Sequence, residues 1–149
     1  MTYNHLLKMI HMATGVPEDQ LMISGSCAYG PWLYIDLSDN ITTASDVDIL
    51  VPCRTKVQPL IDRIQSVTRT EVKQDPNYRD SQGSIYLTIC GIKVNLVLLD
   101  TVELAAWRRA TIGMRTQAMS NPFIFQSKEI RVTCFKAVCT AVTVNLIIP

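Results

Sequence analysis

The hydrophobic positions near the N-terminus follow a helical period. Tyr3, Leu6, Leu7 and Ile10 recur at intervals of three and four residues, which places them on one face of a helix. Gly15 follows this stripe, and glycine commonly ends a helix because it tolerates a left-handed backbone. The pattern predicts an amphipathic first helix that is closed at Gly15.

Two short apolar runs with the character of strands come next. Residues 21–23 are apolar and lead into the Ser24-Gly25-Ser26 turn, so we expect a buried strand that ends there. Residues 46–51 form a second run that stops at Pro52, where a strand loses a hydrogen-bond donor. Residues 27–45 between the two runs are mixed and rich in residues that break regular structure.

A second helical stripe follows the second strand. Pro59 lies near its beginning and is compatible with a helix if it occupies the first turn, where its missing N–H is not needed. The apolar positions that define this helix are Val57, Leu60, Ile61, Ile64 and Val67.

The middle of the chain changes to a β pattern. We expect a weak strand over residues 69–74 and a turn-rich loop over residues 75–83. Residues 84–90 and 92–99 are both rich in β-branched side chains and meet at Gly91. This arrangement predicts a β-hairpin.

Two further helices are expected at the C-terminal end. The first follows Asp100, whose side chain is placed to cap it, and ends at Asn121-Pro122. The second begins near Ser127. The predicted inner face of the first comprises Leu104, Trp107, Thr111 and Met114, and that of the second Ile130, Cys134 or Phe135, Val138 and Val142. The order of elements predicts an α/β or α+β fold, with a mixed sheet flanked by helices.

Composition narrows the class of protein. The chain has 149 residues, 48% of them hydrophobic, and 14 basic against 13 acidic residues give a formal net charge of +1. This size predicts one domain over residues 1–149, and the apolar fraction excludes a disordered chain. The near-zero charge argues against a plain nucleic-acid-binding module, because such modules attract the phosphate backbone with excess positive charge.

The cysteines and the hydropathy of the chain indicate the cellular compartment in which the protein is expected. The five cysteines are an odd number, and none are spaced as in a zinc or redox pair. Buried free thiols suit a reducing environment. The most apolar stretch, residues 137–148, is too short to cross a bilayer. We therefore expect a cytoplasmic protein with no membrane partner.

The chemically informative feature is a Gly-Ser turn followed by two aspartates. Asp46 and Asp48 are two residues apart on the second strand, so their side chains share one face and repel each other unless a cation neutralises them. Mg²⁺ prefers such oxygen ligands and shares them with phosphates. Gly25 and Ser26 offer a close backbone approach and donors for phosphate oxygens. The alternative is a pair of aspartates at a solvated strand end, beside an ordinary turn.

These residues resemble a known family. Residues 24–30 (SGSCAYG) and 45–51 (SDVDILV) are similar to the signature of the nucleotidyltransferase-fold superfamily, which includes the DNA polymerase beta type. Looser similarity, between residue 94 and residue 135, is to small phage-encoded nucleotidyltransferase-like proteins. The resemblance implies a minimal nucleotidyltransferase fold.

The resemblance also implies a separate role for each of the site residues. Gly25 and Ser26 would bind the phosphates of a nucleoside triphosphate. Asp46 and Asp48 would bind Mg²⁺ or Mn²⁺, and a third acidic residue would come from a later strand. Asn95 stands where that third residue belongs. We expect Asp46, Asp48 and Asn95 to form the catalytic group.

Asn95 affects the expected rate of transfer more than the expected binding of Mg²⁺–NTP. Its neutral amide removes one negative charge and one candidate general base, and losing a positioned base typically costs about 10²–10⁴-fold in rate. We therefore expect the protein to bind Mg²⁺–NTP. We expect the transfer of a nucleotide to a hydroxyl of a nucleic acid, a protein or a small molecule to be weak or absent. The alternative is a catalytically inactive protein that acts by protein–protein interaction, for example a phage protein that inhibits a host system. Asn95 is equally compatible with a buried asparagine that only stabilises the hairpin.

Further side chains have two interpretations. Trp32 and Tyr34 are flat enough to stack on a base, but core packing is favoured. A helical segment carries three arginines that either meet a triphosphate or an RNA acceptor, or form a solvated face: Arg108, Arg109 and Arg115.

Overall fold

A five-stranded sheet organises the chain. The computed structural model describes residues 1–43 and 45–147. Its helices and strands, in chain order, are α1 (Tyr3–Thr14), the 3₁₀ turn η1 (Glu18–Gln20), β1 (Met22–Ser24), α2 (Ser26–Tyr29), β2 (Val47–Pro52), α3 (Val57–Thr68), β3 (Lys73–Asp75), β4 (Gly83–Ile89), β5 (Ile92–Leu99), α4 (Thr101–Ser120) and α5 (Lys128–Ile147).

The sheet is mixed and open. Its strand order is β1-β2-β5-β4-β3. β2 and β5 run parallel, whereas β1 with β2, β4 with β5, and β3 with β4 are antiparallel. The expected α+β class, with a mixed sheet between flanking helices, is confirmed.

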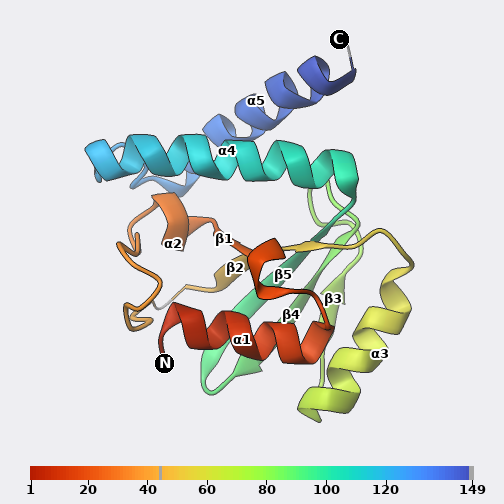
Figure 1. The fold of residues 1–149 in the computed structure, drawn as a ribbon. Helices are drawn as coiled ribbons and strands as arrows, with labels where there is room; N and C mark the ends of the chain where they lie inside the picture. The colour runs from red at the N-terminus through yellow and green to blue at the C-terminus, as the bar shows by residue number, and fades with distance from the viewer. Residues whose placement is uncertain (44, 148–149) are drawn as a thin grey trace.

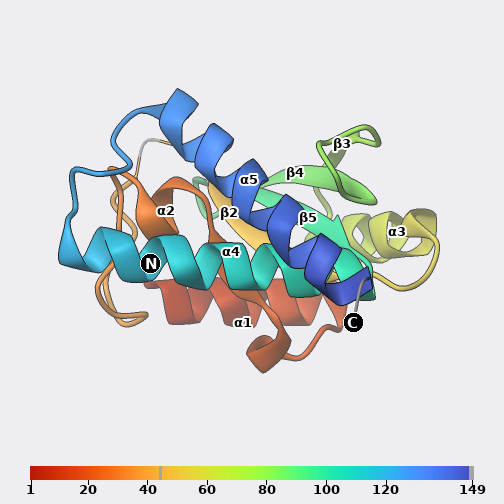
Figure 2. The ribbon, with the colours of Figure 1, turned by 90° about the horizontal axis from the view of Figure 1, so that it is seen from above.

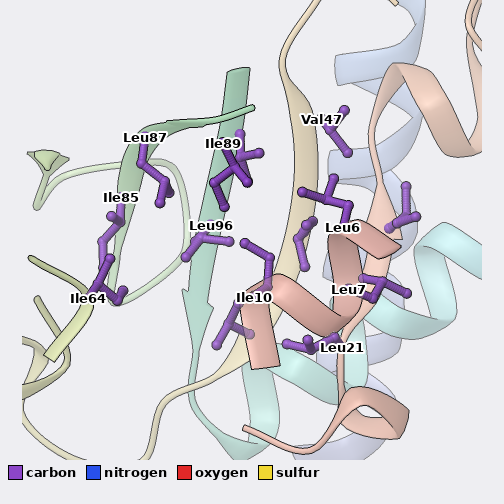
Figure 3. Close-up of a cluster of buried hydrophobic side chains, with 14 of the residues drawn as sticks. Leu6, Leu7, Ile10, Leu21, Val47, Ile64, Ile85, Leu87, Ile89 and Leu96 are labelled. Atoms are coloured by element: carbon purple, nitrogen blue, oxygen red, sulfur yellow. The ribbon is translucent and has the colours of Figure 1, made fainter. Parts of the chain in front are cut away.

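Helices cover both faces of the sheet. Helices α1 and α3 lie on one face, and α2, α4 and α5 lie on the other (Figures 1 and 2). Side chains alternate along β5, so that Leu96 packs in the cluster under α1 and α3 while Val97 packs under α4. Figure 3 shows the first cluster, in which Leu6 and Ile10 of α1 meet Leu96 at the centre of the sheet.

The N-terminal helices form as their patterns predict. Tyr3, Leu6, Leu7 and Ile10 are buried, and α1 ends at Gly15, whose φ of 78° is in the left-handed region. In α3, Pro59 falls in the first turn, as expected. Val67, predicted on the inner face of α3, is instead 51% exposed and lies in the last turn of the helix.

Two expectations for the middle of the chain are corrected. The strand predicted over residues 69–74 is β3, which spans only Lys73–Asp75. Arg69 belongs to the end of α3, where it caps the helix with a left-handed backbone. Ser26, expected in a turn, begins the short helix α2. The predicted hairpin at Gly91 is confirmed.

The two C-terminal helices pack on each other above the sheet. The expected face of α4 is confirmed, since Leu104, Trp107, Thr111 and Met114 are all buried. Asp100 caps α4 through reciprocal bonds with Glu103, as the sequence predicted for its side chain.

Helix α5 contributes one large side chain to the core. Phe135 is 2% exposed, whereas Ile130 is 49% exposed, so Ile130 does not belong to the inner face. Both sequence alternatives, Cys134 and Phe135, contact the core, Phe135 fully buried and Cys134 partly buried. Within the described residues, no helix combines the length and the apolar character that a membrane span requires.

Candidate functional site

A row of polar residues crosses the sheet on the face beneath α4 and α5. The strand register pairs Lys73 with Tyr86, Tyr86 with Asn95, Asn95 with Asp48, and Asp48 with Ser24. Residues directly opposite each other on neighbouring strands point to the same face. One position from every strand therefore contributes to a single polar line, and Asp48 and Asn95 are at its centre.

The Gly25-Ser26 turn lies directly against this line. Gly25 precedes α2 with φ 67° and ψ −151°, a conformation that is available essentially to glycine alone. A β-carbon on Gly25 would lie 2.1 Å from Asp48 Oδ2. Glycine is thus required both by its backbone conformation and by the close approach of the Asp48 carboxylate.

All five predicted site residues line one cleft. Its volume is about 660 Å³, and its walls include Gly25, Ser26, Asp46, Asp48 and Asn95. These residues come from the β1–α2 turn, the start of β2, and β5, three places that the antiparallel β1–β2 and the parallel β2–β5 pairings bring together. The structure therefore gathers the predicted residues, and their functional role stays a prediction.

Burial and neighbouring charges govern the electrostatics of Asp48. Desolvation raises the pKa of its carboxyl to about 6, and the charge of Asp46 contributes in the same direction. The side-chain hydrogen bond from Asn95, of 3.1 Å from Nδ2 to Oδ1, opposes this rise in pKa. The positive charges of Arg79 and Lys128 also favour the ionised carboxylate.

Three cations on the cleft wall were not identified from the sequence. Arg79 lies in the loop between β3 and β4, and Lys128 and Arg131 are in the first turn of α5. The spacing of Lys128 and Arg131, three residues apart at a helix start, puts them on one face and is the signal that would have found them. Arg79 had no comparable signal, because it lies in a loop whose position depends on the whole sheet.

Arg79 and Arg131 are held in place by defined contacts. The Arg79 guanidinium lies over Trp107 and Phe135, 5.2 and 5.4 Å from the ring centroids. Its φ of 45° is uncommon for a residue with a side chain, and such strain gathers at functional sites. Arg131 Nη1 donates to the carbonyl oxygens of Phe125 and Gln126, each at 2.7 Å. Both cations are therefore fixed at the cleft rather than free in solvent.

The arginines singled out from the sequence have other contacts. Arg115 donates to the carbonyl oxygen of Ala28 at 3.0 Å and lies 3.9 Å from the ring centroid of Tyr34. Arg108 donates to the carbonyl oxygen of Gln20. Neither of them lines the cleft, and neither does Arg109. The interpretation in which this helical segment meets a triphosphate in the cleft is wrong for the described structure.

The aromatic residues of the cleft also differ from the sequence candidates. Tyr34 packs on Tyr3 with ring centroids 4.9 Å apart, which confirms the packing interpretation for Tyr34, whereas Trp32 is 38% exposed. The tyrosines that do line the cleft are Tyr29, Tyr78 and Tyr86.

The oxygen donors of the cleft fit one hard cation. Asp46 and Asp48 supply carboxylates, and the amide oxygen of Asn95 is buried with no hydrogen-bond partner, which leaves it available as a third oxygen ligand. Among the described residues, no group of three or more histidine, cysteine, aspartate or glutamate side chains forms a ready-made metal site. A bound Mg²⁺ would thus depend on phosphate oxygens or water for its remaining ligands.

A second hollow adjoins the cleft. It has a volume of about 450 Å³, shares Asp46 and Tyr86 with the cleft, and is also lined by Lys73 and Lys93. Asp46 and Tyr86 therefore separate the cleft from this second hollow and line both.

Comparisons with known proteins give no match. No family model, no curated protein and no solved structure is significantly similar to this chain.

Proposed function

We propose that this protein binds a Mg²⁺–nucleoside triphosphate in the cleft and is of the nucleotidyltransferase type. The observation that carries the proposal is that one cleft contains the Gly25-Ser26 turn, two aspartates and three basic side chains. Two aspartates serve a divalent cation and three basic side chains serve a polyanion. Mg²⁺–NTP carries both charges on one ligand.

The residues have separate roles in this proposal. Asp46 and Asp48 would hold the cation with the amide oxygen of Asn95, and Lys128 and Arg131 would bind phosphate oxygens. When bound, Mg²⁺ neutralises charge on the phosphates and polarises them toward attack. The adjoining hollow, which shares Asp46 with the cleft, would hold the acceptor that supplies the hydroxyl.

Binding without turnover is the second candidate. Asn95 is 3% exposed and donates to Asp48, so the position where a base is needed holds a neutral donor that already has a partner. A neutral amide cannot take a proton from an acceptor hydroxyl. This observation favours nucleotide binding without turnover, and such a protein would act through a partner that its nucleotide-loaded fold binds.

Thermal unfolding with Mg²⁺ and each NTP tests the binding proposal. A ligand that binds the folded state raises the apparent melting temperature, so we expect stabilisation by at least one Mg²⁺–NTP. Lys128→Gln should reduce it, because Lys128 lines the cleft. Lys136→Gln, an exposed position on the same helix outside the cleft, is the matched control. A well-folded protein stabilised by no Mg²⁺–NTP would refute the proposal.

Transfer of label from radioactive NTP to a cell extract separates the two candidates. The wild type should label little or nothing if Asn95 limits turnover. Asn95→Asp restores a carboxylate and should raise the labelling by about 10²-fold or more. NTP binding with no labelling in either protein would favour the second candidate, binding without turnover.

A further inference from the structure

A separate hollow of about 560 Å³ lies at the other end of β2. We call it the arginine hollow, and its walls include Thr14, Gly15, Pro52, Arg54, Leu104 and Arg108. Asp48 lines the cleft and Pro52 lines the arginine hollow. Both residues belong to β2, so the two sites are about 13 Å apart along this strand. The arginine hollow shares no residue with the cleft.

The charge of the arginine hollow is unbalanced. Arg54 and Arg108 both line it, and its lining contains no carboxylate. The acidic residues that neighbour lining residues in the sequence, Glu18, Asp19 and Glu103, do not line it. Two like charges facing one hollow repel each other unless an anion lies between them.

Arg108 carries a donor without an acceptor. Its Nη2 atom donates to the carbonyl oxygen of Gln20, which fixes the guanidinium at the hollow. Its Nε atom is buried and has no hydrogen-bond partner. An unsatisfied buried donor on a charged group is costly, so protein groups compensate the charge of Arg108 only in part, and an anion in the hollow would offset the remainder.

We infer that the arginine hollow binds a phosphate group. Guanidinium groups bind phosphate oxygens through charge-assisted hydrogen bonds, and two of them offset the negative charge of a phosphate group. The phosphate group is either free orthophosphate or an esterified phosphate of a nucleic-acid strand. This site is independent of the proposed NTP cleft.

Glycine amide signals in ¹⁵N–¹H NMR spectra report on each site separately. Gly15 lines the arginine hollow and Gly25 lines the cleft. In Mg²⁺-free buffer at constant ionic strength, orthophosphate should shift the Gly15 signal and reach saturation. Arg108→Lys keeps the charge but loses the guanidinium group, and should weaken this binding by about tenfold or more. Arg109→Gln, an exposed neighbour on α4 that does not line the hollow, should leave it unchanged.

A second variant and a second ligand complete the test. Arg54→Gln is at an exposed position, where substitution does not endanger folding, and should also weaken the Gly15 response. A short single-stranded oligonucleotide that shifts Gly15 at lower concentration, with steep salt dependence, would identify esterified phosphate as the ligand. A response to orthophosphate alone would identify the free ion. A Gly15 signal unmoved by both ligands, or equal weakening in Arg109→Gln, would overturn the inference.

Discussion

The side chain of Asn95 donates a hydrogen bond of 3.1 Å to Asp48 Oδ1 across the parallel pair of strands β2 and β5. The partner that Asp48 meets is therefore neutral, and it supplies a donor where a carboxylate would supply an acceptor. The amide oxygen of Asn95 remains buried and without a partner. The free energy of unfolding of the protein, as well as any activity, should therefore change when the charge at position 48 or 95 changes.

Asp48→Asn should stabilise the folded protein at neutral pH. The pKa of the Asp48 carboxyl is raised to about 6 in the folded state, mainly by desolvation, so the ionised form destabilises the fold at pH above 6. This cost is relieved as pH falls through 6 and the carboxyl takes up a proton. At pH 7.5 the variant should gain on the order of 2 kcal/mol in the free energy of unfolding.

Denaturant unfolding between pH 4 and pH 7 measures this effect. The wild type should lose the stability contributed by this group as pH rises from the ordinary carboxyl pKa to about 6, with no further loss above it, and Asp48→Asn should lack that loss. Asp62→Asn, at an exposed position on α3, is the control and should keep the pH dependence of the wild type. Parallel pH profiles for wild type and Asp48→Asn would contradict the prediction.

Gly25→Ala should destabilise the protein and abolish NTP binding. The backbone conformation at Gly25 costs a residue with a side chain about 1–3 kcal/mol, and the added β-carbon would displace the carboxylate of Asp48. Gly113→Ala is the opposite case, since a β-carbon there meets nothing within 4 Å.

The two glycine variants form a matched pair. Gly113 lies inside α4, so its replacement by alanine should stabilise the protein by about 0.5–1 kcal/mol through helix propensity. Thermal unfolding with and without Mg²⁺–NTP gives both stability and binding. A Gly25→Ala protein as stable as the wild type would show that the close approach to Asp48 is not rigid.

Asn95→Asp should make the stability of the protein dependent on Mg²⁺. A second carboxylate opposite Asp48 in a buried position adds like-charge repulsion, so the metal-free variant should unfold at lower temperature than the wild type. Mg²⁺ should recover this loss, because it neutralises the pair. The measurement is the difference in melting temperature between Mg²⁺ and a chelator. An equal Mg²⁺ response in the variant and the wild type would mean that position 95 does not face the cation.

Phe135→Ala should detach α5 and with it the cations of the cleft. Phe135 packs against Trp107 and Tyr29, with ring centroids 5.0 and 6.0 Å away, and removing such a buried ring costs about 3–5 kcal/mol. The position of Lys128 and Arg131 depends on α5, so NTP affinity should fall as well. Ile130→Ala, on an exposed position of α5, should change stability by less than about 0.5 kcal/mol. Calorimetric titration with Mg²⁺–NTP and thermal unfolding check both variants, and full affinity in Phe135→Ala would contradict the prediction.

The sequence predicts those parts of the fold that depend on local pattern. The stripe of α1, the first-turn position of Pro59 and the hairpin at Gly91 follow from periodicity and backbone preference. The capping role of Asp100 follows from its position before the helix. Each of these features is decided within a few residues of chain.

The remaining parts depend on contacts between distant segments. The cation Arg79 reaches the cleft because β3 and β4 place its loop beside α4 and α5, and no local pattern contains that information. Periodicity left Cys134 and Phe135 as alternatives because they are adjacent on the helix. Both contact the core, and the aromatic contacts with Tyr29 and Trp107 make Phe135 the more deeply buried of the two. The sequence left Arg115 either as a ligand-binding or as a solvated side chain, because its partners, Ala28 and Tyr34, are far away in the chain.

The polar line across the five strands also constrains how the sheet can assemble. A slip of one residue between β2 and β5 would put Val94 or Leu96 opposite Asp48 and turn Asn95 toward the apolar layer beneath α1 and α3. Such a slip would bury an amide among hydrocarbon and leave a carboxylate without its donor, so alternative pairings are strongly disfavoured. The residues that give the cleft its chemistry thus also specify the alignment of the strands, and substitutions that remove them should broaden the ensemble of folded states before they unfold the protein.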